Sequence, residues 1–256
     1  MLLLAALAAA CQEPELVVGA WSCPAPPRVA EDGGELEPFT GPVEMPWSTD
    51  FEHELCDLNV AQGYCYAHTD ASYEFVSTFA RSGKKSVAFT IDTEPMNRPD
   101  TRCVREGVLP EDAIYGAWYY FPEQHDAPDN WNLLHFQGGS DLHNLWDVIV
   151  ASDEASGKLK LWVRGYVPNR VPLMQDDPPT FVPIGAWFHL EFRLKRASDA
   201  TGQVTLYQDG KVIVDQPGIV TDDSSWGQWY VGNLAYSLAP SKSTLYVDDI
   251  SIRPVP

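Results

Sequence analysis

Residues 158–166 read KLKLWVRGY, and in this stretch apolar and polar side chains alternate from one position to the next. Successive side chains of an extended chain point to opposite faces, so Leu159, Leu161 and Val163 share one face. The other face carries basic and aromatic groups, namely Lys158, Lys160, Trp162, Arg164 and Tyr166. A period of two with one apolar face predicts a β-strand that is buried on one side only.

Alternating apolar segments recur along the chain, whereas the helical period is nearly absent. The other segments are SVAFTID (86–92), AIYGAWYYF (113–121), WNLLHFQ (131–137), LWDVIVA (145–151), WFHLEFRLKR (187–196), QVTLYQ (203–208) and TLYVDDISI (244–252). Clusters of Gly, Pro, Asn and Asp separate them, and Asp209-Gly210 predicts a tight hairpin turn. Because no linker interrupts residues 50–256, we expect one all-β sandwich of two antiparallel sheets.

The composition excludes several classes of protein. The 256 residues include 17 Lys and Arg against 36 Asp and Glu, a formal charge of −19, and no basic run that could neutralise phosphates. Nucleic acid is therefore excluded as a partner. The Gly-x-Ser-x-Gly, phosphate-loop and His-Glu-x-x-His motifs are absent, which argues against the commoner esterases, nucleotide-binding proteins and metalloproteases.

The N-terminus has the composition of an export signal. Residues 1–11, MLLLAALAAAC, contain an apolar stretch, three small residues and Cys11, which predicts a lipoprotein signal cleaved before a lipid-modified cysteine. An ordinary secretory signal is the alternative. Residues 12–49 hold seven prolines and seven acidic residues against a single Arg28, which predicts an extended tether. We thus expect a cell-envelope lipoprotein, at the outer surface or in the periplasm, that contacts the membrane only through its lipid.

Four cysteines remain once Cys11 is set aside, namely Cys23, Cys56, Cys65 and Cys103. An even number in an exported protein predicts two disulfides, for which three pairings are open. No Cys-x-x-Cys spacing occurs, and no closely spaced pair of histidines lies beside these cysteines. Both absences argue against a zinc site.

Several segments, taken in order, resemble a known superfamily. They are Asp50-Phe51-Glu52, RSGKKSVAFTID (81–92), IYGAWYYFPE (114–123), WNLLHFQGG (131–139), GAWFHLEFRLKR (185–196), QVTLYQDGKVIV (203–214) and LYVDDISI (245–252). Across residues 50–256 the chain is similar to the concanavalin A-like jelly-roll superfamily. More narrowly, it resembles polysaccharide lyases of the heparin lyase I and alginate lyase type. The resemblance implies a jelly-roll domain that binds a polysaccharide and cleaves it by β-elimination.

The resemblance also implies site residues. In those lyases a Gln-x-His pair, an Arg-x-Glu strand and a Tyr-rich strand form the active site. Here His135 and Gln137 lie two residues apart in reversed order, and Tyr230 and Tyr236 lie six apart, so each pair shares a strand face. The segment that stands in the place of the Arg-x-Glu strand contains Arg102, Arg105 and Glu106.

β-Elimination from a uronate requires a base for the C5 proton, a donor for the leaving O4 and groups that neutralise the carboxylate. We expect His135 to be the base and Tyr236 the donor, with Gln137 and either Arg105 or Arg164 at the carboxylate. Hydrolysis is less favoured, because the Glu-x-Asp-x-x-Glu strand of jelly-roll glucanases is absent. His135, Gln137, Arg164 and Tyr236 are therefore expected to converge on one concave face.

The alternative function is a non-catalytic, lectin-like carbohydrate-binding protein, in which aromatic side chains stack on sugar faces. The candidate binding residues are Arg164, Trp162, Tyr166, Trp118 and Tyr230. Since the tether holds one basic and seven acidic residues, residues 50–256 keep 16 basic and 29 acidic residues, a charge of −13. This charge repels a polyanion unless the groove is locally positive, and so favours a neutral glycan. An envelope scaffold without sugar affinity is a third interpretation.

The expected chemistry requires no cofactor. The resemblance allows a structural calcium that bridges the first and last strands, with Glu52 and Asp248 as its ligands, because calcium prefers carboxylate oxygens. Solvated surface charge is the simpler interpretation of these two residues.

The N-terminal pattern leads to a prediction about anchoring. Cys11→Ser should leave export unchanged but release the protein from the membrane fraction, because the thiol that accepts the lipid is lost. Fractionation of cells that express wild type and variant measures the effect. A wild type that is itself absent from the membrane fraction would contradict the lipid anchor.

Overall fold

The computed structural model describes residues 23, 38–94, 98–128, 130–222 and 224–256. Cys11 and most of the predicted tether lie outside these residues, so the lipid anchor and export stay predictions. The described part consists mainly of strands, with one short helix, α1 (Cys56–Val60). It contains no helix that is long and apolar enough to cross a membrane.

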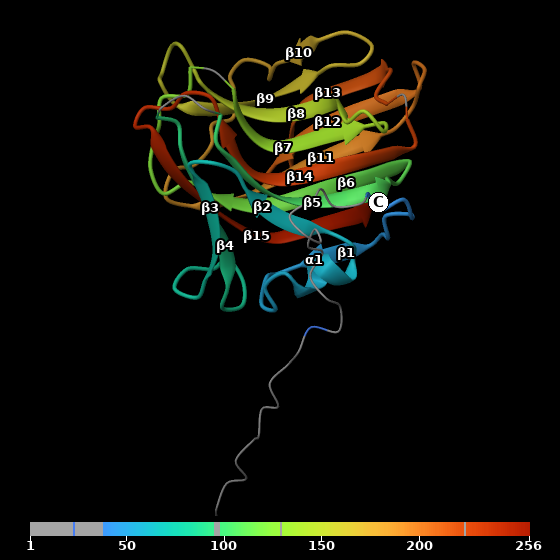
Figure 1. Cartoon of the computed structure of the whole chain (residues 1–256). Coiled ribbons are helices and arrows are strands. Elements are labelled where there is room, and N and C mark those ends of the chain that lie inside the picture. The colour runs from blue at the N-terminus through green and yellow to red at the C-terminus, as the bar shows by residue number, and fades with distance from the viewer. Residues whose placement is uncertain (1–22, 24–37, 95–97, 129, 223) are drawn as a thin grey trace, which may run out of the picture.

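The strands of the described residues form two antiparallel sheets that pack face to face (Figure 1). The eight-stranded sheet has the order β13 (Lys211–Ile219), β12 (Gly202–Gln208), β11 (Trp187–Lys195), β6 (Asp112–Tyr120), β15 (Lys242–Pro254), β4 (Ser86–Asp92) and β3 (Ala71–Val76), and β1 (Trp47–Thr49) also pairs with β15. The seven-stranded sheet has the order β10 (Val171–Leu173), β9 (Leu159–Gly165), β8 (His143–Ser152), β7 (Trp131–Gly138), β14 (Trp226–Ala235), β5 (Asp100–Val108) and β2 (Tyr64–Ala67). The predicted all-β jelly-roll sandwich is confirmed.

Each alternating segment of the sequence forms a strand. KLKLWVRGY becomes β9, in which Leu159, Leu161 and Val163 are fully buried. Asp209 and Gly210 join β12 to β13 with φ angles of 52° and 76°, as a tight hairpin turn requires. Alternation alone did not single out β5 or β14, because glycines and buried polar residues interrupt their apolar pattern, and only the resemblance pointed to both.

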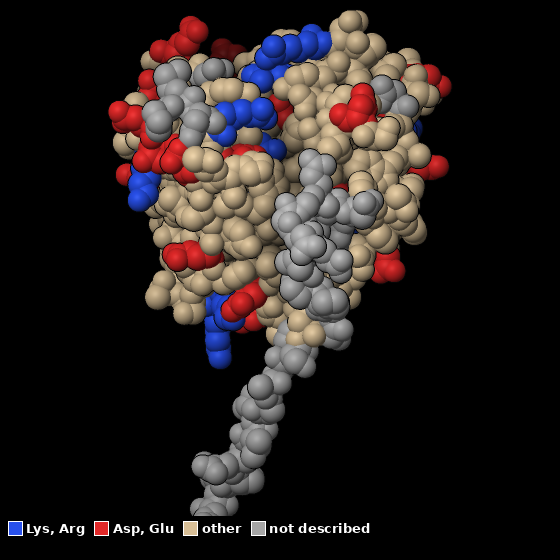
Figure 2. Space-filling view, in the orientation of Figure 1, with Lys and Arg blue, Asp and Glu red and all other residues tan. Residues whose placement is uncertain are grey.

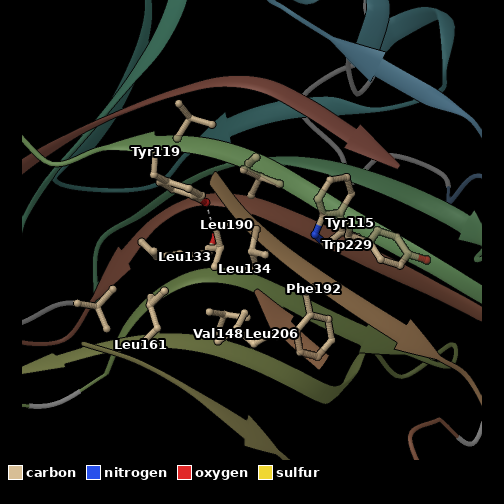
Figure 3. Close-up of a cluster of buried hydrophobic side chains, with 14 of the residues drawn as sticks. Tyr115, Tyr119, Leu133, Leu134, Val148, Leu161, Leu190, Phe192, Leu206 and Trp229 are labelled. Atoms are coloured by element: carbon tan, nitrogen blue, oxygen red, sulfur yellow. Dashed lines mark hydrogen bonds between the residues drawn. The ribbon is translucent and has the colours of Figure 1, made fainter. Parts of the chain in front are cut away.

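Large aromatic side chains fill the space between the inner faces of the two sheets. Those almost entirely excluded from solvent include Trp131, Trp146, Trp229, Tyr115, Tyr119, Phe136, Phe188 and Phe192. Tyr115 of β6 meets Phe136 of β7 edge to face, with ring centroids 5.0 Å apart. It meets Trp229 of β14 in the same way at 5.1 Å (Figure 3). These contacts between the sheets stabilise one fixed stacking of the two layers.

Two disulfides form, as the even number of cysteines predicted. They join Cys23 to Cys56 and Cys65 to Cys103. The second bridge links directly opposed residues of β2 and β5, and the first attaches the N-terminal segment to α1. Disulfides are typical of proteins from oxidising compartments.

Two bulges distort the middle of the seven-stranded sheet. The pairing of β14 with β7 changes register between Val231 and Leu234. The pairing of β7 with β8 changes register between Asn132 and Leu134. A bulge bends its strand and leaves backbone groups without a partner on the neighbouring strand, so these groups need other partners.

A side chain of the opposite sheet satisfies backbone groups at both bulges. Tyr119 of β6 is fully buried, and its hydroxyl donates to the carbonyl of Leu133 at 2.8 Å (Figure 3). The same hydroxyl accepts the N–H of Gly232 at 3.3 Å. Burial raises the pKa of Tyr119, so the phenol stays protonated and can donate. One hydroxyl thus fixes both irregular strands to the core.

Gly232 is required by the close approach of β14 to β5. A Cβ atom at this position would lie 2.3 Å from the carbonyl oxygen of Thr101 and 2.7 Å from the Cα of Arg102. Both neighbours are backbone atoms, which cannot move aside as the end of a side chain can. Any side chain here would therefore push the two strands apart.

The hydroxyl of Tyr119 leads to a prediction about stability. Tyr119→Phe should lower the free energy of unfolding by about 2 kcal/mol, because the bulged backbone loses buried hydrogen bonds while the ring is kept. Urea denaturation measures the change. The matched control is Tyr115→Phe, since the buried Tyr115 hydroxyl has no hydrogen-bond partner among the described residues. Equal losses in the two variants would contradict the role of the Tyr119 hydroxyl.

Candidate active site

A row of directly opposed residues crosses the outer face of the seven-stranded sheet. Tyr230 of β14 lies opposite His135 of β7, His135 opposite Asp147 of β8, and Asp147 opposite Arg164 of β9. Opposed residues on one face of a sheet have neighbouring side chains. All four are buried, although they point away from the core, so the row is a polar layer that needs its own partners.

The row lies in an open groove, which has two adjoining parts. Each part has a cavity volume of about 280 Å³, and the first is lined by Asn130, Asn132, Asn144, Asp147, Arg164, Tyr166, Arg170, Leu234 and Tyr236. The second part extends toward β2 and is lined by Tyr66, His68, Asp100, Gln137 and Tyr230. Arg98, Arg102 and His135 line both parts, which makes the groove continuous. Its volume is in the range of ligand-binding clefts.

His135 is held by a buried carboxylate. Asp147 Oδ1 lies 2.5 Å from His135 Nδ1, and Asp147 Oδ2 accepts the hydroxyl of Tyr166 at 2.6 Å. Burial alone would raise the pKa of Asp147, but the interactions with His135 and Tyr166 outweigh burial and lower it. The ionised carboxylate therefore accepts a hydrogen bond from the Nδ1–H group, which leaves Nε2 of His135 as the nitrogen with a free lone pair.

The environment of His135 keeps the ring neutral. Burial lowers the pKa of His135 below its usual 6.5, and the charges of Arg102 and Arg98 lower it further. The Asp147 carboxylate opposes this shift without reversing it. A neutral imidazole with a fixed tautomer can accept a proton at neutral pH, which is the property of a general base.

Arginines border the groove on both sides of His135. Arg102 is almost fully buried, and its ionic contact is a 4.0 Å separation between Nε and Asp100 Oδ2. Its guanidinium lies 5.5 Å from the centre of the Tyr230 ring. Among the described residues the guanidinium of Arg102 has no hydrogen-bond partner, although it carries five N–H donors. A buried cation with unused donors is arranged to meet an anion.

The groove is positive within an acidic protein. Arg98, Arg102, Arg164 and Arg170 line it, whereas its two carboxylates, Asp100 and Asp147, each contact a histidine. Figure 2 shows Lys and Arg side chains in the upper part of one face, where Figure 1 places β8, β9 and β10, with Asp and Glu side chains around them. The overall charge of −19 thus does not describe the groove, and the argument for a neutral glycan loses its basis.

Most of the residues predicted to form the site lie in this groove. Gln137 accepts the hydroxyl of Tyr230 at 2.7 Å, and that hydroxyl also contacts Gln228. Burial raises the pKa of Tyr230. Tyr236 follows the end of β14 and is 37% exposed, with the guanidinium of Arg98 5.4 Å from its ring centre. The structure therefore brings together His135, Gln137, Arg164, Tyr166, Tyr230 and Tyr236.

Three predicted residues lie elsewhere. Arg105 is three positions from Arg102, so alternation turns it to the inner face, where its guanidinium stacks 4.1 Å from the Trp47 ring and burial lowers its pKa to about 10. Trp118 belongs to β6 of the other sheet and stacks on His189. Trp162 packs against the guanidinium of Arg164 at 4.8 Å and does not line the groove. Arg102 thus takes the position expected for Arg105.

The carboxylates expected to bind calcium face backbone N–H groups instead. Glu52 Oε1 accepts the N–H groups of Lys84 and Lys85 at 2.5 and 2.6 Å. Asp248 Oδ2 accepts the N–H groups of residues 81–82. Oxygens that face N–H donors do not fit a cation, and the described residues include no group of His, Cys, Asp and Glu that could hold a metal ion.

Sequence reasoning missed Asp147 and Asp100, and it named Arg102 without choosing it over Arg105. Asp147 carried a usable signal, since a single carboxylate within the apolar strand LWDVIVA predicts a buried charge that needs a partner. Asp100 gave no comparable signal, and the resemblance that pointed to the segment with Arg102 and Arg105 could not show which of the two faces the groove.

The fold and the groove define the class of protein. A jelly-roll sandwich with a positive groove, a carboxylate-held histidine and tyrosines is the arrangement of a carbohydrate-active domain. The sequence profile described as polysaccharide lyase matches residues 45–251. The chain belongs to the polysaccharide lyase family, as the resemblance predicted. A search of curated proteins found no match.

Solved structures with a similar fold include lyases. The chain superposes with a TM-score of 0.59 on the endo-β-1,4-glucuronan lyase of the fungus Trichoderma reesei, at 19% identity over 74% of this chain and 90% of that chain. For the cellulose induced protein Cip1 the TM-score is 0.59, at 16% identity over 81% and 97%. For the alginate lyase vAL-1 from Chlorella virus it is 0.50, at 15% identity over 72% and 91%. At these identities the similarity establishes the fold alone.

The pair of His135 and Asp147 leads to a prediction about pH. Because burial lowers the pKa of His135, the fall of kcat/KM for polysaccharide cleavage at acid pH, as the imidazole becomes protonated, should lie at lower pH than for an ordinary histidine. Asp147→Asn should lower kcat/KM about 100-fold and move this acid limb to still lower pH, because the charge that favours imidazolium is lost.

The matched control is Asp141→Asn, since Asp141 contacts His143 at 2.8 Å outside the groove. This variant should keep the rate and the pH profile of wild type. An acid limb that stays in place in Asp147→Asn would contradict the assigned partnership.

Proposed function

We propose that this chain is a lyase that cleaves a uronate-containing polysaccharide by β-elimination. One observation carries the proposal: a neutral histidine with a fixed tautomer shares a groove with Arg102, a buried arginine that has no hydrogen-bond partner among the described residues. A base and an anion-binding group side by side match the two demands of proton removal next to a carboxylate.

The reaction assigns one role to each group. The uronate carboxylate binds Arg102, with Gln137 as a further donor, so that negative charge can develop on it. Nε2 of His135 takes the C5 proton, the C5–H electrons form the C4=C5 bond, and the C4–O4 bond breaks. The leaving O4 takes a proton, which produces one chain with a free hydroxyl and one with an unsaturated uronate.

Tyr236 is the better candidate for the proton donor. The hydroxyl of Tyr230 already contacts Gln137 and Gln228, and Tyr230 is buried beside His135. Tyr236 lines the groove and is partly exposed, so its hydroxyl can reach a ligand. The guanidinium of Arg98 lies 5.4 Å from the centre of its ring, so a cation stands beside the proposed donor.

The charge of the groove supports an acidic substrate. The arginines that line it offer donors to successive carboxylates of a polyuronate, whereas a neutral glycan would leave these cations without partners. Glucuronan and alginate, after which two of the similar structures are named, are polyuronates of this kind. Both are therefore the first substrates to test.

The proposal is tested with purified protein and a panel of alginate, glucuronan, heparin and pectin. Wild type should produce the ultraviolet absorbance of unsaturated uronate with at least one of them. His135→Ala should lower kcat by about 100-fold to 10,000-fold, because the general base is removed. His189→Ala is the matched control, since His189 lies on the other sheet, stacked on Trp118, and should keep full activity.

Two results would contradict the lyase. Full activity of His135→Ala would exclude this histidine as the base. Binding of a polyuronate without any turnover by wild type would instead assign the chain to the lectin-like alternative.

A further inference from the structure

A second group of histidine, aspartate and tyrosine lies in the groove at the β2 edge. His68 Nδ1 is 2.5 Å from Asp100 Oδ1, and the hydroxyl of Tyr66 donates to Asp100 Oδ2 at 3.0 Å. Around Asp147 the same three residue types have the same connections, with His135 and Tyr166. Burial raises the pKa of Tyr66, so its hydroxyl remains a donor to the carboxylate.

The exposure of His68 distinguishes this second group from an ion pair that stabilises the fold. The His68 side chain is 68% exposed, whereas that of Asp100 is only 12% exposed. An exposed ring gains little stability from its contact, and a mostly buried carboxylate loses hydration. Asp100 does, however, fix the ring of His68 against Tyr66, with centroids 4.8 Å apart, and leaves Nε2 directed away from the carboxylate. The arrangement positions a polar ring for contact with a ligand.

The position of His68 separates it from the proposed cleavage site. The strands β2, β5, β14 and β7 are consecutive neighbours in the sheet, and His68 directly follows β2. Three strand spacings amount to about 14 Å, and the backbones at His68 and His135 lie further apart still, because Tyr64, four residues before His68, is the residue of β2 in register with His135. This distance exceeds a single sugar ring, so one sugar cannot engage both histidines. Arg98 and Arg102 line the groove between the two groups.

We propose that Tyr66, His68 and Asp100 form a second saccharide subsite, which binds another unit of the same polyuronate chain that is cleaved at His135. His68 Nε2 contacts the hydroxyls of this unit, and Arg98 is near enough to meet its carboxylate. The subsite makes the protein select chains that extend past the cleavage position toward β2. This inference rests on the proposed function, from which it takes the polyuronate as substrate.

The experiment compares His68→Ala with wild type on size-defined oligomers of glucuronan and alginate. For oligomers long enough to reach β2, KM should rise about tenfold, the loss expected for one good hydrogen bond, while kcat changes less than twofold. The shortest oligomer that wild type cleaves should be cleaved equally well by both proteins. His68→Gln, which keeps a side-chain N–H donor, should recover part of the affinity.

The matched control is His143→Ala, because His143 also contacts an aspartate but does not line the groove. It should leave KM unchanged for every oligomer. An equal loss for short and long oligomers in His68→Ala, or no loss at all, would overturn the subsite.

A calorimetric titration keeps this test separate from the test of catalysis. If wild type cleaves none of the oligomers, the proposed function fails, and binding of the long oligomers still decides about His68. About tenfold weaker binding by His68→Ala would support the subsite, whereas equal binding by the two proteins would overturn it.

Discussion

The hydroxyl of Tyr119 is the contact on which the shape of the seven-stranded sheet depends. Regular strands would keep every backbone group within the ladder, but β7 and β14 are bulged at the middle of the sheet. The bulges expose a carbonyl and an N–H to the core, where no water can reach them, and the hydroxyl of Tyr119 satisfies both. The opposite sheet thus determines the local bend, and through the bend it determines how His135 and Tyr236 face one groove.

The charge that lines the groove is opposite in sign to the net charge of the whole chain. Carboxylates dominate the chain, yet the groove presents arginines, and its own carboxylates orient histidines. At physiological ionic strength, exposed charges are screened over about 8 Å, so distant acidic residues act weakly on a ligand in the groove. The nearby, partly buried guanidinium groups act strongly, because solvent screens them less. An acidic surface is therefore compatible with an acidic substrate, and it disfavours adsorption of the same polymer outside the groove.

Strand alternation was enough to predict the sandwich, because each apolar face is formed by alternate residues of one short segment, such as Leu159, Leu161 and Val163. The same alternation correctly placed His135 with Gln137 on one face. It failed for Arg105, since a strand whose parity is unknown offers both Arg102 and Arg105, and only the structure shows which one faces the groove. The groups that tune the site were hidden for a related reason. Asp100 contacts His68 across strands that are far apart in the chain, and such a pairing cannot be derived from a single sequence. Asp147 lies on the strand that follows that of His135, but two shifts of register between these strands hide which residues are opposed.

The disulfide between Cys23 and Cys56 shortens the stretch of chain that could separate a lipid anchor at Cys11 from the domain. Without this disulfide, all the residues between Cys11 and β1 could separate the anchor from the domain. With it, an anchor at Cys11 could lie no further from the domain than about 12 residues of chain can span, which is about 40 Å. The domain would then contact polysaccharide close to the membrane surface and could not reach polymers further away. A covalent bond far from the groove would in this way decide which polymers the groove ever meets.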